Sequence, residues 1–342
     1  MTYAQQQIER ILDAAQNLDN EGVCCELQGY LDELISYAST FADEMNVCEN
    51  CGRIISYGHT HEGYDGNTYC GCCVEDANRA YSPIRSYHYH KGTYEFKDNG
   101  EVLPQKFRGF ELEIETNGLN LELFEILENY DSEFAFEEDG SLNNGFEVIS
   151  NPMSFEYWRN VGFDVLRDLI TDLKGVGGVY SWDGGNCGLH VHFSRDEWSS
   201  ETFRTLIKLI IANPTYFKAL SGRDDFGYCR IPNFNDYDLE SLYNSERYLA
   251  VNFTRETAEF RFFRGTLDTP SIWCSIELCD YLLRYCEHIS ENGDICDYTL
   301  SPRGFEEWLR ATTSNADILL GFIARRHRIW NLKQKRIAQR GY

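Results

Sequence analysis

Two histidines stand at alternate positions of a short apolar run, LHVHF, over residues 189–193. Strand side chains alternate between two faces, so His190 and His192 would share one face while their apolar neighbours pack on the other. An imidazole can bind a metal ion through a neutral ring nitrogen or donate a hydrogen bond through an N–H. Two satisfied core or surface histidines are the alternative, and the pair alone does not separate the two interpretations.

A second run, FRGFELEIE, alternates glutamates with apolar residues. Glu111, Glu113 and Glu115 would lie on one face of a strand and repel one another unless water or a cation separates them. Taken alone, this strand is explained by a solvated sheet face. The segment AEFRFF repeats the arrangement, with Glu259 and Arg261 on one face and phenylalanines on the other.

The segment FAFEEDGSLNNGFEVIS predicts a hairpin, with Asn144-Gly145 available for its turn. Glu147 follows Asp139 by eight residues, an even separation that puts both carboxylates on one side of a hairpin without a bulge. A slip of one residue exchanges Asp139 for Glu138, and both stay open. Four strands thus each offer a polar side to a common surface. Carboxylates and a histidine suit magnesium or manganese, and an arginine among them suits phosphate.

Two Cys-x-x-Cys pairs, Cys48/Cys51 and Cys70/Cys73, enclose a loop rich in glycine, histidine and tyrosine. Each pair forms a tight turn, and four converging thiolates make a tetrahedral zinc site. Such a site has no open coordination position, so we expect structural zinc rather than catalysis; unligated buried cysteines are the alternative. The other residues that could supply the fourth ligand are Cys72, and more weakly His59 or His61.

Composition limits the class of protein. The chain has 342 residues, 42% of them hydrophobic, a formal net charge of −24 and a pI near 4.7. Such acidity argues against nucleic acid or an anionic membrane as a partner of the whole surface. No apolar stretch reaches the roughly 18 residues of a membrane span, and the first residues lack signal-peptide features, so we expect a cytoplasmic protein. The 13 cysteines then indicate metal binding or burial rather than disulfides.

Hydrophobic periodicity and the cysteine spacing divide the chain into five expected parts: a helical hairpin over 1–46, a four-cysteine zinc-binding module over 47–82, a linker over 83–106, a main domain over 107–295, and C-terminal helices with a basic tail over 296–342. In the main domain the pattern predicts strands over 107–115, 133–138, 145–150, 188–194, 248–253 and 257–263, and helices over 155–173, 201–212 and 272–288. Short Gly/Asn turns without a regular βαβ rhythm favour an α+β fold with a mainly antiparallel sheet. Nucleic acid would bind, if at all, only at the basic tail.

Five stretches of the main domain, taken together and in order, resemble the amidoligase family of the glutamine synthetase-like superfamily, common in phages and bacteria. They are GFELEIE (109–115), EDGSLNNGFEVISNP (138–152), CGLHVHFS (187–194), RYLAVNF (247–253) and EFRFFRGTLD (259–268). The resemblance implies a funnel of antiparallel strands with flanking helices, to which this chain adds its N-terminal helical and zinc-binding module.

The resemblance also implies a reaction and a site. The reaction is ATP-dependent amide formation between a carboxylate and an amine, small molecules or peptides, through an acyl phosphate. His192 and Arg261 would contact phosphate groups. The chain has no Walker-type G-x-x-x-x-G-K, so phosphate binding would depend on metals and arginines. The residues implied to hold two or three magnesium or manganese ions are Glu111, Glu113, Asp139, Glu147, His190 and Glu259.

Other residues have expected roles near this site. A carboxylate such as Glu115 or Glu138 could take the proton of the attacking amine, and the sequence does not choose between them. Arg223 and Arg247 are candidates to bind the substrate carboxylate or an ATP phosphate through their planar guanidinium groups. For Arg230, an ion pair with a nearby aspartate is an equally good explanation.

Three other functions stay open at this point. A metal-dependent hydrolase would use the His-x-His pair to hold zinc and an activated water, but the next histidine, His288, falls in a helical pattern. A phosphotransferase acting on a guanidino group is a second enzymatic alternative. A non-catalytic adaptor that docks through its zinc module is the third.

Overall fold

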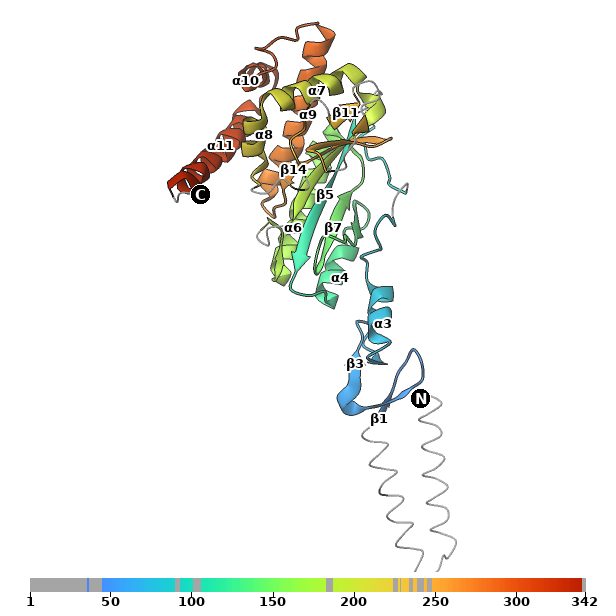
Figure 1. The fold of residues 1–342 in the computed structure, drawn as a ribbon. Coiled ribbons are helices and arrows are strands. Elements are labelled where there is room, and N and C mark those ends of the chain that lie inside the picture. The colour runs from blue at the N-terminus through green and yellow to red at the C-terminus, as the bar shows by residue number, and fades with distance from the viewer. Residues whose placement is uncertain are drawn as a thin grey trace, which may run out of the picture. The chain divides into compact units, whose positions relative to one another are not determined.

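The structure is a computed structural model. It describes residues 36, 45–89, 93–100, 106–182, 187–223, 227, 229–233, 236–238, 243–244 and 248–339. The helical hairpin expected over 1–46 lies outside these residues apart from 36, 45 and 46. The chain divides into two compact units, Met1–Pro83 and Ile84–Tyr342. Both combine helices with antiparallel strands, as the expected mixed class requires (Figure 1).

The described part of the first unit is a small cysteine-rich module. β1 (Met45–Val47) pairs with β2 (Ile54–Ser56), and β3 (Thr60–Glu62) pairs with β4 (Thr68–Cys70), both antiparallel. A 3-10 turn, η1 (Tyr57–His59), joins the two hairpins, and α3 (Val74–Tyr81) follows. The buried centre of this module consists of Cys48, Ile55, Tyr69 and Cys70. So few apolar side chains make a weak core, and modules of this size commonly need a metal or a cross-link.

The second unit is built on an eight-stranded antiparallel sheet in the order β13-β14-β10-β5-β7-β6. The short strands β8 and β9 pair with opposite ends of the long central strand β5. The strand bounds are β5 Phe107–Thr116, β6 Phe134–Glu137, β7 Gly145–Ser150, β8 Met153–Ser154, β9 Val179–Tyr180, β10 Gly188–Ser194, β13 Val251–Phe253 and β14 Thr257–Arg264. A separate two-stranded ribbon pairs β11 (Tyr237–Asp238) with β12 (Tyr243–Asn244).

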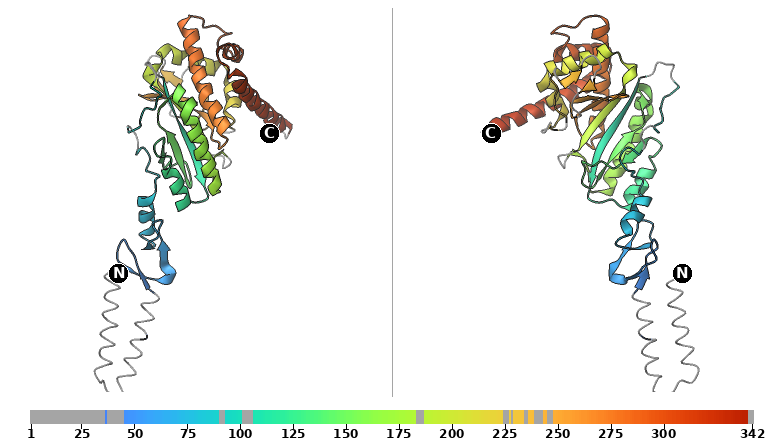
Figure 2. Two further views of the ribbon diagram at one scale, coloured as in Figure 1. Left: turned by 180° about the vertical axis from the view of Figure 1, so that it is seen from behind. Right: turned by 45° about the vertical axis from the view of Figure 1, so that its right-hand side comes forward.

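Helices cover one face of this sheet. The view from behind in Figure 2 shows the long helices α6 (Phe163–Val176) and α9 (Thr269–Glu291) lying across it. Strand residues on the covered face, such as Leu112, Val191 and Phe260, are completely buried. The remaining helical segments are α4 Leu121–Glu128, α5 Phe155–Tyr157, the π-helix η2 Trp158–Gly162, η4 Arg195–Glu197, α7 Ser200–Ala212, α8 Pro214–Ser221, α10 Pro302–Thr312 and α11 Ala316–Gln339.

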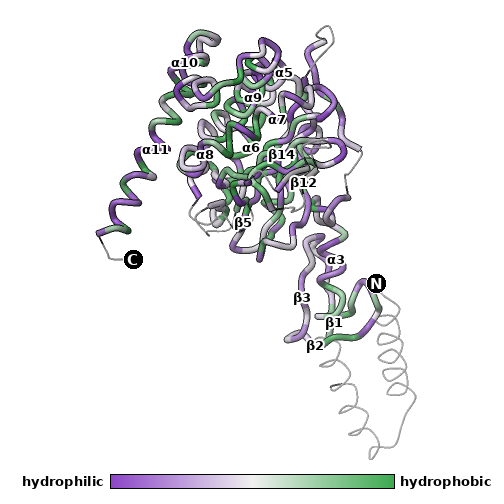
Figure 3. Tube along the Cα trace, turned by 45° about the horizontal axis from the view of Figure 1, so that its top comes forward, coloured by the Kyte–Doolittle hydropathy of each residue, from purple (hydrophilic) through white to green (hydrophobic). Residues whose placement is uncertain are grey.

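Local sequence signals explain where the helices begin and end. Ser199 caps α7 by accepting a hydrogen bond from the Thr202 N–H, and Pro214 opens α8. Gly222 ends α8 in the left-handed region with φ 71°. The hydrophobic segments gather in the interior of this unit, whereas the outer part of α11 is largely hydrophilic (Figure 3).

The structure departs from the expected elements in three places. Parts of the expected linker lie against the sheet, since Arg85 bridges to Glu137 and Lys97 to Met153. The hairpin turn does not use Gly145, which begins β7: a Cβ there would stand 2.1 Å from the Ile114 carbonyl oxygen, so only glycine fits this position in the strand. The periodicity also missed the short helices α4 and α8, each of eight residues.

None of the described helices combines the length and the apolar composition that a membrane crossing requires.

Candidate functional site

The open face of the central sheet carries a cluster of carboxylates around one histidine. In the strand register, His190 of β10 pairs with Glu111 of β5, and Glu113 of β5 pairs with Glu147 of β7. Cross-strand partners point to the same face, so three neighbouring strands deliver these side chains together. Glu259 arrives from β14 on the other side of β10, where it pairs with His192.

His190 lies at the centre of this cluster. Its Nδ1 is 3.2 Å from Glu111 Oε2 and 3.4 Å from Glu259 Oε1, and its Nε2 is 3.6 Å from Glu113 Oε1. The structure holds two overlapping groups with ligand atoms within 4.8 Å of one another: Glu111, His190 and Glu259, and Glu113, Glu147 and His190. We call these residues the acidic cluster. A neutral imidazole has one lone pair, so His190 can ligate an ion in only one of the groups at a time.

Burial makes the charge of the acidic cluster costly without a cation. Glu113, Glu147, Glu259 and His190 are all buried. Burial, followed by the negative charges of Glu111, Asp139, Glu113 and Glu259, raises the pKa of Glu147 to about 10. A carboxyl group forced to keep its proton at neutral pH is what crowded carboxylates produce, and a divalent cation removes that penalty. The donor set therefore fits hard cations such as magnesium or manganese.

Glu111 and His192 form an ion pair at the edge of the acidic cluster. Burial opposes ionisation of Glu111, but His192 and His190 outweigh it and hold its pKa well below the usual range. Burial likewise disfavours a charged His192, yet Glu111 prevails and raises the pKa of His192. The His192 Nε2 lies 3.3 Å from Glu111 Oε1 but makes no hydrogen bond with any described residue. This ring nitrogen therefore faces the Glu111 carboxylate without ideal hydrogen-bond geometry.

Two arginines adjoin the acidic cluster. Arg261 Nη1 donates a hydrogen bond to Glu259 Oε1, while its buried Nε has no partner in the described part of the chain. Arg223 is buried and donates through Nε to the Phe263 carbonyl oxygen at 3.1 Å. Its Nη2 lies 2.4 Å from the point where a Cβ on Gly188 would stand. The two guanidinium groups therefore contact the acidic cluster at different places, Arg261 on β14 and Arg223 beside Gly188.

Asp139 and Glu115, both nominated from the sequence, are not part of the acidic cluster. Asp139 lies in the loop after β6, where its Oδ1 accepts a hydrogen bond from the Ser141 N–H at 2.7 Å. Glu115 is buried, and its two oxygens accept from the N–H groups of Asn143 and Asn144 at 2.9 and 3.0 Å. It therefore anchors the hairpin loop. Arg247 lies outside the described residues.

Glu137 takes the position that the sequence assigned to Asp139. It pairs directly with Glu147 in the β6–β7 register, is buried, and accepts a hydrogen bond from the His88 N–H at 2.6 Å. The hairpin loop spans residues 138–144, so the strand pairing stops before Asp139. The alternation in FAFE was the signal for Glu137, because it places this residue opposite the buried phenylalanines. Glu138 is exposed at the start of the loop.

A cavity of about 140 Å³ adjoins Glu111 and His192. Gly109 of β5 lines it without a side chain, and the other walls are mostly apolar or aromatic, including Tyr94, Phe107, Ile149 and Pro152. The space fits a small apolar or aromatic group of a ligand whose polar end reaches the acidic cluster.

The cysteines of the first unit converge as a tetrahedral metal site requires. The sulfurs of Cys48, Cys51, Cys70 and Cys73 lie within 4.8 Å of one another. Burial opposes the thiolate of Cys48, but N–H donors of Cys51, Cys70 and Asn50 outweigh it and lower its pKa to about 6. The Cys70 sulfur, and then burial, raise the pKa of Cys73 to about 12. Four sulfurs this close together cannot all become thiolates without a cation between them. A zinc ion would supply that charge.

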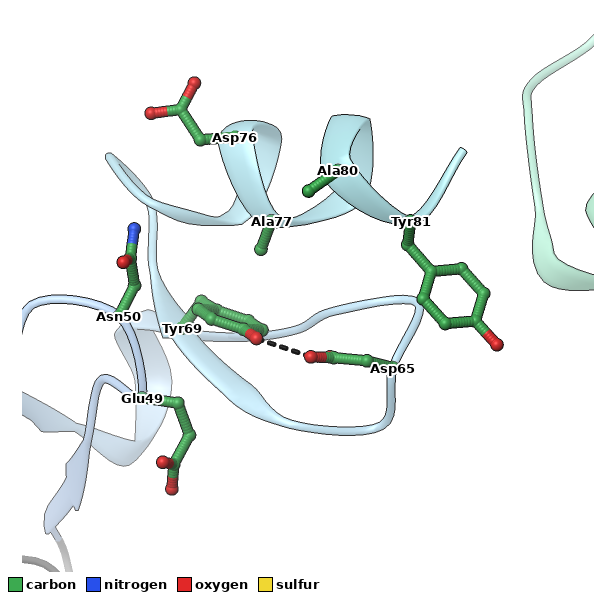
Figure 4. A pocket seen from close by; sticks show the side chains of 8 residues that line it. All are labelled: Glu49, Asn50, Asp65, Tyr69, Asp76, Ala77, Ala80 and Tyr81. Carbon is green, nitrogen blue, oxygen red and sulfur yellow. Dashed lines mark hydrogen bonds between the residues drawn. The ribbon is translucent and has the colours of Figure 1, made fainter. Parts of the chain in front are cut away.

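The structure separates the candidate fourth ligands. Cys73 belongs to the group of four, whereas Cys72 is exposed and outside it. His59 Nδ1 instead pairs with the Ser56 hydroxyl at 2.8 Å. The same unit has a cavity of about 430 Å³, shown in Figure 4, whose walls include Glu49, Asp65 and Asp76. The residues lining it include no histidine or cysteine, and the hydrogen bond to Asp65 raises the pKa of the Tyr69 hydroxyl, so we assign the cavity no chemistry.

Comparisons with known proteins give a distant structural likeness. No protein-family model matches the chain, and no curated protein matches it. Solved structures do match, among them one described as a "novel glutamine synthase homolog". That match has 12% sequence identity and a TM-score of 0.38, and it covers 66% of each chain, just under two thirds.

Proposed function

We propose that the second unit is an ATP-dependent carboxylate–amine ligase that works with at least two magnesium or manganese ions. The observation that carries the proposal is the environment of His190, whose two ring nitrogens lie within 3.6 Å of three carboxylates on the two strands that flank β10. Buried carboxylates around a single histidine are a donor set for hard cations, and phosphate oxygens are the ligands such cations most often bridge.

The proposed site divides the work among its residues. The acidic cluster holds the cations, which when bound neutralise the charge of the nucleotide phosphates. His192, charged through its pairing with Glu111, donates an N–H to a phosphate oxygen. Arg261 and Arg223 supply planar donors for the phosphoryl group or for the substrate carboxylate. The substrate carboxylate would attack the γ-phosphate of ATP to give an acyl phosphate and ADP. The amine would then displace inorganic phosphate from the acyl phosphate to give the amide.

The proton of the amine needs an acceptor other than Glu115. Both Glu115 oxygens already accept backbone N–H groups, so this carboxylate is committed to the loop. Glu138 is exposed at the start of the same loop and remains the better candidate.

A hydrolase is the weaker interpretation of the same geometry. Catalytic zinc sites are rich in histidine nitrogen or cysteine sulfur ligands. Each of the two groups here instead holds one histidine and two glutamates. The first unit is proposed to hold a structural zinc ion, and an anionic partner is proposed only for the basic end of α11.

An ADP-release assay tests the proposal. The purified protein receives ATP, magnesium and a pool of carboxylates, with or without a pool of amines. We expect ADP to form only when magnesium and both pools are present, and to be lost in Glu113→Gln. Glu122→Gln, an exposed glutamate on α4, is the matched control and should behave as wild type. Activity that ignores ATP, or that survives Glu113→Gln, would contradict the proposal.

A further inference from the structure

Arg264, the last residue of β14, lies on the face of the sheet that carries the acidic cluster. It pairs in register with Gly188 of β10, which shares its face with His190 two residues later. The alternation along β14 would otherwise place Arg264 with Phe260 and Phe262 on the buried side. A register shift between β10 and β14 changes this, and Phe263 becomes the core residue before Arg264.

The Arg264 side chain meets Arg326 of α11 over a glycine. Gly222 has φ 71°, and a Cβ there would stand 2.3 Å from Arg326 Nη1 and 3.3 Å from Arg264 Cδ. Any side chain at this position would collide with the Arg326 guanidinium. Gly222 therefore lets the two arginines approach each other from β14 and α11, which are far apart in the sequence.

These arginines carry unpaired charge. Arg326 is only 5% exposed, and the Nε atoms of Arg264 and Arg326 are buried without a hydrogen-bond partner. Within the described ranges, neither side chain makes a hydrogen bond or an ion pair, although the Arg326 guanidinium lies over the Phe322 ring, 5.0 Å from its centroid. A third cation, Arg325, donates through Nη2 to the Ser271 hydroxyl at 3.1 Å.

The pKa of Arg326 reflects the positive charges crowded around it. Burial, followed by the positive charges of Arg264 and Arg325, lowers the pKa of Arg326 to about 10. Asp268 is the nearby carboxylate that opposes this shift, and it already accepts a hydrogen bond from Ser271 at 2.5 Å. A buried guanidinium without a partner costs stability, and an anion bound beside it would remove that cost.

We propose that Arg264, Arg325 and Arg326 form an oxyanion site that binds a phosphate or carboxylate group of the ligand on which the acidic cluster acts. Arg223 connects this arginine site with the acidic cluster. It follows Gly222 in the chain, and its Nη2 reaches Gly188 beside His190 Nε2. One end of the ligand would meet cations held by carboxylates, and the other would meet guanidinium groups. The assignment of the ligand rests on the proposed function, whereas the binding of an anion does not.

Isothermal titration with inorganic phosphate in EDTA tests this site, with chloride at equal ionic strength as the blank. We expect wild type to bind phosphate and Arg326→Gln to bind it at least about tenfold more weakly, since charge-assisted hydrogen bonds are lost. Arg328→Gln removes the same charge from an exposed position of the same helix and should keep the wild-type affinity. Arg264→Gln should match Arg326→Gln, and it carries the test if the latter variant fails to fold.

Two results would overturn the proposal. One is that wild type binds neither phosphate nor acetate above the chloride blank, as it would if residues of the chain itself neutralised the arginines. The other is that Arg328→Gln weakens binding as much as Arg326→Gln, which would show a general effect of charge.

Two further arms separate this site from the proposed function and identify the source of the anion. Glu113→Gln should still bind phosphate in EDTA even if no ligase activity exists, so failure of one idea leaves the other standing. Competition with magnesium–ADP then decides the source. Displacement of phosphate assigns the site to a nucleotide phosphate, and simultaneous binding assigns it to the acidic group of the substrate.

Discussion

The backbone N–H of Gly188 donates a hydrogen bond to Glu113 Oε2 at 2.5 Å, so the start of β10 is fixed directly to a residue of the acidic cluster. A Cβ at Gly188 would stand 2.4 Å from Arg223 Nη2 and 2.9 Å from His190 Nε2. Glycine is required here by the close approach of the Arg223 guanidinium and the His190 imidazole.

Gly188→Ala should therefore damage the site more than the fold. We expect a loss of about 1–3 kcal/mol in the free energy of unfolding, as in other overpacked positions, together with at least about tenfold weaker manganese binding. Gly175→Ala in α6, where a Cβ meets nothing within 4 Å, is the control and should change neither quantity unfavourably. Isothermal titration calorimetry with manganese measures the binding. Equal affinity in Gly188→Ala and Gly175→Ala would refute the close approach of Arg223 and His190 to Gly188.

His190 and His192 should fail in different ways. His190→Ala removes the centre of the acidic cluster, so the magnesium concentration needed for ATP turnover should rise. His192→Ala leaves the carboxylates in place and should lower turnover by about 10²-fold with nearly unchanged metal affinity, as expected for a donor to a phosphate. Magnesium titrations of initial rate measure both. Wild-type rates in both variants would remove this face of the sheet from the active site.

Glu147 should make the metal-free protein less stable as pH rises. Its pKa is about 10 in the folded protein against 4.5 for the ordinary group, so the folded state holds a proton that the unfolded state has released between these values. The stabilising contribution is complete below about pH 4.5 and is lost toward pH 10. In EDTA, the stability of Glu147→Gln relative to wild type should therefore increase with pH. Urea unfolding at pH 6, 7 and 8 measures the difference, and a constant difference would contradict the assignment.

Alternation along the strands was enough to place Glu111, Glu113, His190 and Glu259 on one face, because the two-residue period of strand side chains is a local property. The pairing register was not accessible in the same way. The choice of Asp139 assumed that β6 and β7 continue to the turn, but pairing stops at Glu137 and a seven-residue loop follows. Arg264 was missed because a register shift in β14, set by the neighbouring strand, reverses its face. Arg326 comes from α11, and no sequence pattern links that helix to the sheet.

Glu115 should behave as a structural residue. Removing its carboxylate in Glu115→Ala leaves the N–H groups of Asn143 and Asn144 without acceptors, which should cost about 1–3 kcal/mol of unfolding free energy. Activity per folded molecule should fall less than tenfold. A variant that keeps wild-type stability and loses its activity would instead make Glu115 the proton acceptor.

The zinc proposal separates two adjacent cysteines. Cys73→Ser removes one of four converging sulfurs and should release zinc, as should Cys48→Ser, whereas Cys72→Ser should retain one ion per chain. Metal analysis after dialysis measures the content. Zinc that is retained in Cys73→Ser and lost in Cys72→Ser would reverse the assignment of the fourth ligand.

The central claim is that the acidic cluster joins a carboxylate to an amine at the expense of ATP, and its most direct test is mass spectrometry of a metabolite extract incubated with the protein, magnesium and ATP. We predict a new species whose mass equals that of two extract components less one water, formed together with an equal amount of ADP and absent with Glu113→Gln. Formation of ADP without any such condensation product, or the same product from the variant, would contradict the account.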